Sequence, residues 1–389
     1  MNGSMSRRQW LITSGLGASA SLALPHVLPA MSVDGIRGSA PTDYAALERE
    51  ITAARAAAGP IRLSSNENPF GMSPKAKAAL MAAWDQHNKY ALPATGQLRA
   101  AFAKSVGVAP ENVLVTQGSG EVLDIAALAY GMHGGEIVTA WPTYEGLPRY
   151  AEAIGATVHK VPLLPDLGHD FDMMDRRTTN AVDLVFVCNP NNPTGTLHDD
   201  KRIRDFVVST SRRAVVLVDE AYHDFVDDKS YKSMIDLVQR GDNVIISRTA
   251  SKVHGLAALR VGFAIARADI IARLEKHVTG TPNVFGVQAA IAAVADTEYQ
   301  AFVTKTNREG RAMLTDALTK LGKRVAPSHT NFVFFQAGLP TDTVRQAMLA
   351  KGFMVGRAFP PYNDWVRVSI GTTEEMKAFV QILPEAVRA

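Results

Sequence analysis

The chain has little cysteine, and neither positive nor negative charge is in marked excess. Each of these two features excludes some classes of protein. Cys188 is the only cysteine in 389 residues, so an intramolecular disulfide and a cysteine-rich metal or iron–sulfur site are excluded. Lys and Arg number 41 against 38 Asp and Glu, a net charge of +3, and no basic run is longer than a pair. A nucleic-acid partner and a polybasic membrane patch are therefore not expected, and a small-molecule partner is. The ten histidines are dispersed, and no metal site is predicted.

The apolar stretch near the N-terminus is too short to be a membrane anchor. Leu11 to Leu24 contains glycines and serines and falls below the ~20 apolar residues that span a bilayer. Arg7 and Arg8 precede this stretch and Ala30 follows it, a pattern that resembles a twin-arginine export signal. The sequence thus predicts a signal at residues 1–30, a linker at 31–42 and a periplasmic protein, with a cytoplasmic location as the alternative.

The rest of the chain is long enough for two domains and 47% of all residues are hydrophobic, as expected of a globular protein. Short apolar runs alternate with helical patterns, which predicts an α/β fold with a mainly parallel sheet and crossover helices. The predicted strands are 113–116, 137–140, 157–161, 183–188, 214–219, 244–247 and 261–266, and the predicted helices between them include 121–132, 145–154 and 199–210.

The pattern changes near residue 288. A long helical stretch from 288 to 321 precedes short strands at 332–335, 353–355 and 366–370 and two further helices. This predicts a large domain at 86–287 and a smaller α+β domain at 288–389. Residues 43–85, expected to form helix, loop and helix, are assigned to the small domain.

Polar motifs follow three predicted strands, where an open α/β sheet binds its ligands. Asn189–Gly195 follows one strand, Asp219–Tyr222 ends the next, and Ser251–Lys252 follows a third. The runs NNPTG, VDEAY and SRTASKVHGLAALRVG resemble the class I/II aminotransferases of fold type I, which use pyridoxal 5'-phosphate (PLP). LSSNENPFG and VRVSIGT are similar to the histidinol-phosphate aminotransferase branch, and five motifs in the family's order form a specific signal.

The resemblance implies PLP as cofactor and three catalytic residues. Lys252 would hold the aldehyde of PLP and carry a proton, Asp219 would keep the pyridine nitrogen protonated, and Tyr222, with Asn192, would hydrogen-bond the phenolic oxygen. The other predicted cofactor contacts are Gly118, Ser119, Gly120, Thr249 and Arg260 at the phosphate, Tyr144 on the ring, and Tyr90 reaching into the neighbouring subunit of a homodimer with shared active sites.

The resemblance also implies an anion-binding substrate site. Arg367 would grip the anionic group, with Arg357 as a second contact and Asn66 and Asn68 at the entrance. The chain departs from the histidinol-phosphate branch at Ala91–Leu92, Gly120 and Ala258. These departures and the expected export favour amino transfer from a glutamate-like amino acid to a 2-oxo acid. The alternatives are a histidinol-phosphate aminotransferase, a PLP-dependent lyase or decarboxylase, and a PLP-binding module without turnover.

Overall fold

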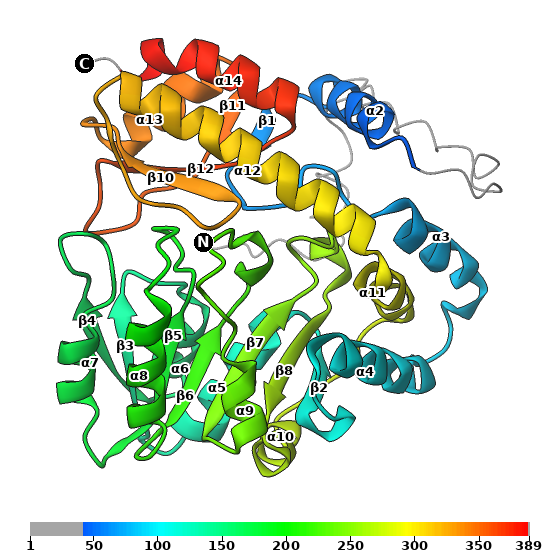
Figure 1. Ribbon diagram of the computed structural model, residues 1–389, viewed down its shortest axis with the longest axis vertical. Coiled ribbons are helices and arrows are strands. Elements are labelled where there is room, and N and C mark those ends of the chain that lie inside the picture. The colour runs from blue at the N-terminus through cyan, green and yellow to red at the C-terminus, as the bar shows by residue number, and fades with distance from the viewer. Residues whose placement is uncertain (1–41, 388–389) are drawn as a thin grey trace, which may run out of the picture. The chain divides into compact units, whose positions relative to one another are not determined.

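The computed structural model describes residues 42–387 (Figure 1). The predicted export signal, residues 1–30, and nearly all of the predicted linker, residues 31–42, lie outside this range. None of the helices in the described range combines the length and the apolar character needed to cross a membrane.

A seven-stranded sheet forms the centre of the larger part of the fold. The strand order is β2-β8-β7-β6-β5-β3-β4, and every pairing is parallel except those of β8 with β2 and β7. The predicted mainly parallel sheet is thereby confirmed. Its strands are β2 (Val113–Thr116), β3 (Glu136–Trp141), β4 (Thr157–Pro162), β5 (Val182–Cys188), β6 (Val215–Asp219), β7 (Val244–Thr249) and β8 (Gly262–Ala266).

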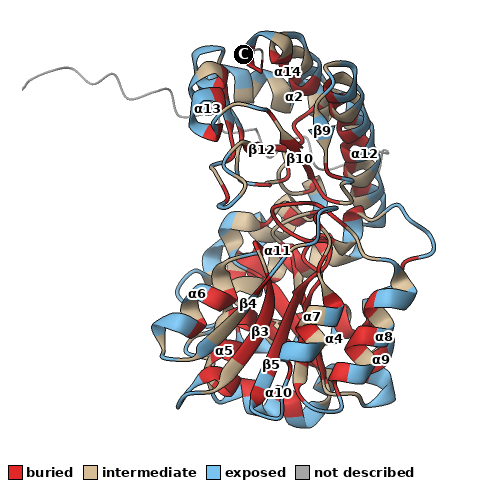
Figure 2. Cartoon of the chain, turned by 90° about the vertical axis from the view of Figure 1, so that its left-hand side faces the viewer, coloured by how far each residue is buried: buried red, intermediate tan, exposed pale blue. Residues whose placement is uncertain are grey.

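Helices cover both faces of this sheet, and the central strands are mostly buried (Figure 2). Alternate residues along a strand point to opposite faces, so Val185 and Val187 pack into one hydrophobic core and Leu184 and Phe186 into the other. One face is covered by α3 (Pro74–Ala82), α4 (Leu92–Val106), α7 (Phe171–Arg177), α8 (Asp200–Thr210), α9 (Ile235–Arg240) and α11 (Val284–Ala295), and the other by α5 (Ser119–Gly131), α6 (Gly146–Ala153) and α10 (Ala268–Glu275).

The smaller part of the fold has two short sheets and a core of its own. Strand β10 (Phe332–Gln336) lies between β9 (Arg324–Val325) and β12 (Trp365–Ser369), antiparallel to both, while β1 (Ile61–Leu63) pairs in parallel with β11 (Phe353–Val355). The helices here are α2 (Tyr44–Ala57), α12 (Thr297–Lys320), α13 (Thr341–Ala350) and α14 (Thr373–Ala386). An ion pair between Arg55 and Glu375 ties α2 to α14.

The predicted single helix at 288–321 is wrong, because the chain breaks at Asp296 into α11 and α12. Asp296 has φ −91° and ψ 69°, outside the helical range, and its buried carboxylate pairs with Lys75 at 3.0 Å. The break sends the two helices to different cores. Helix α11 packs on α3 and α4 against the large sheet, and α12 continues along the small sheet.

Candidate active site

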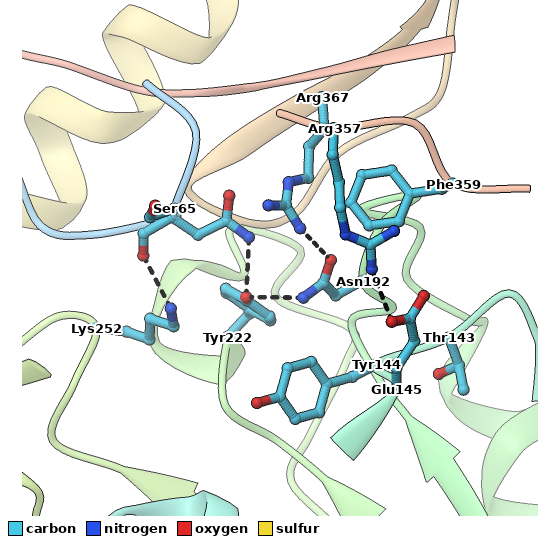
Figure 3. A pocket seen from close by; sticks show the side chains of 11 residues that line it. Ser65, Thr143, Tyr144, Glu145, Asn192, Tyr222, Lys252, Arg357, Phe359 and Arg367 are labelled. Carbon is cyan, nitrogen blue, oxygen red and sulfur yellow. Dashed lines mark hydrogen bonds and ion pairs between the residues drawn. The ribbon is translucent and has the colours of Figure 1, made fainter. Parts of the chain in front are cut away.

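Two adjoining cavities lie at the carboxyl ends of the large sheet's parallel strands, facing the small sheet. The first cavity, of about 290 Å³, is lined by Ser65, Asn66, Thr143, Tyr144, Glu145, Asn192, Tyr222, Lys252, Arg357, Phe359 and Arg367 (Figure 3). The second, of about 190 Å³, is lined by Ser65, Glu67, Ser119, Gly120, Tyr144, Asp219, Ala221, Tyr222, Thr249, Ser251, Lys252, Ala257 and Arg260. Lys252, Tyr222 and Tyr144 border both cavities, so a ligand that spans the cavities must pass these three side chains.

Lys252 follows β7 and presents its amine where the two cavities meet. Its Nζ donates to the backbone oxygen of Asn66 at 2.9 Å and lies 5.4 Å from the centre of the Tyr222 ring. Burial lowers the pKa of Lys252 to about 8, and the Arg367 guanidinium acts in the same direction. The uncharged amine that a nucleophile or proton carrier requires is therefore much more accessible near neutral pH than for an ordinary lysine.

Two amides hold the Tyr222 hydroxyl. Asn66 Nδ2 donates to Tyr222 Oη at 3.1 Å and Asn192 Nδ2 does so at 3.3 Å. Burial raises the pKa of Tyr222 above its ordinary value of 10.0, so the phenol keeps its proton. Since both amides are donors, the phenolic O–H remains able to donate to a ligand oxygen.

Asp219 is a buried carboxylate at the end of β6. It is only 3% exposed, and its Oδ1 has no hydrogen-bond partner among residues 42–387. Burial raises its pKa from 3.8 to about 6. Because an unpartnered buried carboxylate oxygen is costly, its position on the wall of the second cavity favours a ligand with a proton to share.

The far end of the second cavity is suited to an anion. Ser119 and Gly120 form the first turn of the 13-residue helix α5, whose N-terminus carries free backbone N–H groups. The Arg260 guanidinium lies against this turn and donates to Ser251 Oγ at 3.4 Å and to the Ala257 oxygen at 2.9 Å. Gly118, at φ +84°, permits this approach, because a Cβ there would lie 2.1 Å from Arg260 Nη2.

Two arginines from the small part of the fold enter the first cavity side by side (Figure 3). Arg367, on β12, donates to Asn192 Oδ1 at 2.6 Å and to the Ser64 oxygen at 2.9 Å. Burial lowers the pKa of Arg367 to about 10, which leaves it charged at neutral pH. Arg367 has no acidic partner in the described range, and its buried Nε has no partner there. Arg357 instead forms an ion pair with Glu145 at 2.7 Å.

Three predicted site residues are not in the lining of either cavity: Gly118, which directly precedes α5, Asn68 and Tyr90. Asn68 is buried, donates to the Val253 oxygen at 2.9 Å and accepts from the Phe70 N–H, so it shapes its loop and does not line the entrance. Tyr90 is 84% exposed, and within this one chain it touches neither cavity. The remaining predicted site residues line one or both cavities.

Sequence reasoning missed Glu145 and Phe359. Glu145 follows Tyr144 directly, and Phe359 lies two residues after Arg357, so each was adjacent to a residue already singled out. The centre of the Phe359 ring lies 4.4 Å from the Arg357 guanidinium carbon and 4.8 Å from that of Arg367. Within residues 42–387, no cluster of acidic, His and Cys side chains is arranged to hold a metal ion.

Residues 58–383 match the family described as aminotransferase class I and II. The chain belongs to this aminotransferase family. A histidinol-phosphate aminotransferase from Brevibacillus brevis is 37% identical over 336 residues, which cover 84% of this chain and 90% of that protein. A second, from Limosilactobacillus fermentum, is 36% identical, with 81% and 87% covered. The solved structure of the Sinorhizobium meliloti histidinol-phosphate aminotransferase with pyridoxal-5'-phosphate matches with a TM-score of 0.79, 26% identity, and coverage of 92% and 98%.

Aminotransferases of this family depend on PLP, and the residues of this chain fit that group. The α5 N-terminus, Thr249 and Arg260 would hold the phosphate, and Tyr144 would lie on the ring. The orphaned oxygen of Asp219 would accept a hydrogen bond from the protonated pyridine nitrogen and so keep that nitrogen protonated. A Cβ at Gly146 would lie 2.8 Å from Tyr144 Cε1, so this glycine gives the Tyr144 ring its room.

Proposed function

We propose that this aminotransferase moves the amino group of histidinol phosphate, or of a closely related amino phosphate, to a 2-oxo acid. The observation that carries the proposal is the pair of arginines, Arg357 and Arg367, that enters the first cavity opposite Lys252. Guanidinium groups suit both a phosphate and a carboxylate, so one site serves the donor and the acceptor in turn. The names of the relatives support this donor.

Each group of the chain has a task in this reaction. PLP, when bound, supplies the electron sink that makes the substrate Cα–H acidic. The Lys252 amine takes that proton from the substrate Cα and delivers it to the carbon of the cofactor that bears the transferred nitrogen. Its lowered pKa helps this step. Arg367 fixes the anionic end of the substrate so that the Cα–H faces Lys252. The small sheet, which carries Arg367, closes one side of the cavity and limits access of water.

A glutamate-like amino acid is the second candidate for the donor. It is favoured by the Glu145–Arg357 ion pair, which leaves Arg367 as the one arginine of the first cavity without an acidic partner in the described range. A single guanidinium matches a single carboxylate. The two candidates therefore differ in the anion that the donor presents.

Single-turnover reactions of the purified, PLP-loaded protein separate the candidates. Histidinol phosphate, histidinol and glutamate are each supplied, and the conversion of the bound cofactor to its amine form is followed by absorbance. The proposal predicts fast conversion with histidinol phosphate and slow conversion with histidinol, which lacks the phosphate. If glutamate but not histidinol phosphate converts the cofactor to its amine form, the donor is the second candidate, a glutamate-like amino acid. Release of carbon dioxide or ammonia without an acceptor would indicate a lyase or decarboxylase, and no reaction with any amine would indicate a binding module.

We propose a homodimer with shared sites as the working form. Support comes from a group of exposed large side chains around the start of α4, namely Met81, Trp84, Tyr90 and Leu92, with Tyr90 84% and Leu92 63% exposed. Exposed apolar and aromatic groups that lie together are typical of interaction surfaces. In a dimer Tyr90 would reach the site of the partner subunit.

We also propose export through the twin-arginine route, based on Arg7 and Arg8. The cofactor contacts run from Ser119 to Arg260, so PLP is held only by the folded protein, and this route carries folded proteins. Cell fractionation of the wild type and an Arg7→Lys, Arg8→Lys variant tests this. The wild type is expected in the periplasm as a shortened chain and the variant inside the cell; a full-length cytoplasmic wild type would contradict the export proposal alone.

A further inference from the structure

Glu145 is the one acidic side chain in the lining of the first cavity. It stands just before α6, and its Oε2 lies 2.7 Å from Arg357 Nη2. Figure 3 shows the carboxylate pointing up at the Arg357 guanidinium, above Tyr144. The Glu145 side chain is 24% exposed and that of Arg357 is 50% exposed, so this ion pair stands in partial contact with water and can be exchanged.

The two arginines consequently differ in what they offer an anion. Arg367 is buried, and the acceptors of its hydrogen bonds, Asn192 Oδ1 and the Ser64 oxygen, are neutral. The charge of Arg357 is balanced by Glu145. Both guanidinium groups border the Phe359 ring, so one ligand anion is able to contact both.

The charge of the ligand then decides whether Glu145 must give way. A carboxylate carries one negative charge and is matched by Arg367 alone. A phosphate monoester carries close to two charges above its second pKa of about 6, and it gains from a second cation. To use Arg357, the phosphate has to compete with Glu145, and the freed Glu145 carboxylate then lies near the bound dianion.

We propose that Glu145 sets the selectivity of this site between singly and doubly charged anions, by neutralising Arg357 until a dianion takes that arginine over. The inference rests on the proposed function, in which a phosphate and a carboxylate bind at the same end of the cavity. With a carboxylate bound, Arg357 stays on Glu145; with a phosphate bound, Arg357 turns to the ligand. Glu145 is thus a specificity-determining residue and takes no part in the proton transfer.

Binding of two small anions to the PLP-loaded protein tests this. Inorganic phosphate and acetate are titrated calorimetrically at about pH 8, where phosphate is mainly a dianion, at constant ionic strength. Glu145→Gln is expected to raise the phosphate affinity about three- to fivefold, the range of a partly exposed ion pair, and to change the acetate affinity less than about twofold. An unchanged phosphate-to-acetate ratio would overturn the proposal.

Two further variants keep the test decisive. Glu152→Gln removes a carboxylate from the neighbouring helix α6, where Glu152 pairs with Lys160. It is expected to leave the ratio of phosphate to acetate affinity unchanged. If this ratio shifted as much as in Glu145→Gln, the effect would come from net charge alone, and the proposal would be overturned. Arg357→Gln should weaken phosphate binding and abolish the effect of Glu145→Gln in the double variant. Persistence of the effect without Arg357 would also contradict the proposal.

This readout is independent of turnover. If histidinol phosphate proves not to be a substrate, the anion affinities still show whether Glu145 discriminates by charge. If the wild type uses histidinol phosphate but Glu145→Gln leaves the anion ratio unchanged, the proposed function stands and the inference fails.

Discussion

Asp219 is a residue whose burial disfavours the charged form that its role beside the cofactor requires. The sequence predicted its role from the VDEAY motif, and the structure adds the physical reason: the carboxylate is buried and one oxygen has no partner in the described range. Burial that raises its pKa to about 6 disfavours the charged form in the cofactor-free protein. A protonated pyridine nitrogen reverses this, since it supplies the missing partner.

Asp219→Asn is expected to stabilise the cofactor-free protein at neutral pH and not in acid. The native carboxyl has a pKa above its unfolded value of 3.8, so between about pH 4 and pH 6 the native state binds more protons, and wild-type stability falls as pH rises through this window. The full cost above about pH 6 is roughly 3 kcal/mol. Denaturant unfolding of both proteins measures the difference, which should be large at about pH 7.5 and small at about pH 4.5.

The exposed pair of Asp205 with Lys201 provides the control. Asp205→Asn is expected to show no such pH-dependent gain, because both side chains are largely exposed to solvent. An Asp219→Asn variant that is less stable than the wild type at neutral pH without cofactor would contradict the account of Asp219.

At the scale of elements, apolar runs and motif positions predicted the large sheet well. Most of its strands are largely apolar runs buried on both faces, a signal that is local in the sequence; the edge strand β4, which carries His159 and Lys160 and is largely exposed, is the exception. The break at Asp296 was missed because both flanking segments have helical patterns, and the partner of the Asp296 carboxylate, Lys75, is distant in sequence. The contact of Asn68 was not predictable for a similar reason, since its partner Val253 is distant in sequence.

The turn before α5 gives a prediction at this scale. Gly118→Ala would place a Cβ 2.1 Å from Arg260 Nη2 at a residue with φ +84°, so Arg260 has to leave its position at the helix N-terminus. The PLP affinity of the variant is expected to fall about tenfold or more. Folding stability is expected to fall by about 1–3 kcal/mol, because φ +84° with ψ 162° is a backbone region essentially restricted to glycine. Fluorescence titration of the cofactor-free protein with PLP measures the affinity.

Gly134→Ala is a control for the effect of backbone strain on the PLP affinity. Gly134 has φ +86°, and the space that an added Cβ would take is open, so its alanine variant should lose stability through backbone strain alone and keep the PLP affinity. Equal affinity losses in the two variants would show that backbone strain, and not Arg260, is responsible.

At the scale of the whole molecule, the sequence could supply the residues of the site but not their pairings. Arg367 meets Asn192 and Arg357 meets Glu145, and in each pair one member belongs to the small part of the fold and the other to the large part. No local pattern carries that information. The Glu145–Arg357 pair, on which the proposed anion selectivity depends, is therefore a property of the assembled chain.

Shared sites predict complementation between two defective subunits. When Lys252→Ala and Tyr90→Ala chains are expressed together, the mixed dimer has one site with an intact Lys252 and with Tyr90 of the partner subunit. The PLP affinity and turnover of that site are expected to return close to wild-type values, while the Tyr90→Ala homodimer stays impaired. Purification with two different tags isolates the mixed dimer, and a mixed dimer no better than the Tyr90→Ala homodimer would rule out sharing through Tyr90.

The central claim is that Lys252 carries amino transfer with PLP in the two adjoining cavities, and single-turnover spectroscopy of Lys252→Ala tests it most directly. The variant should keep the wild-type circular dichroism spectrum, lose the covalent cofactor signal, and convert the amino donor at least about 10³-fold more slowly. Lys201→Ala, which removes an exposed lysine paired with Asp205, should react at the wild-type rate. Conversion by Lys252→Ala at a rate near that of the wild type would contradict the account.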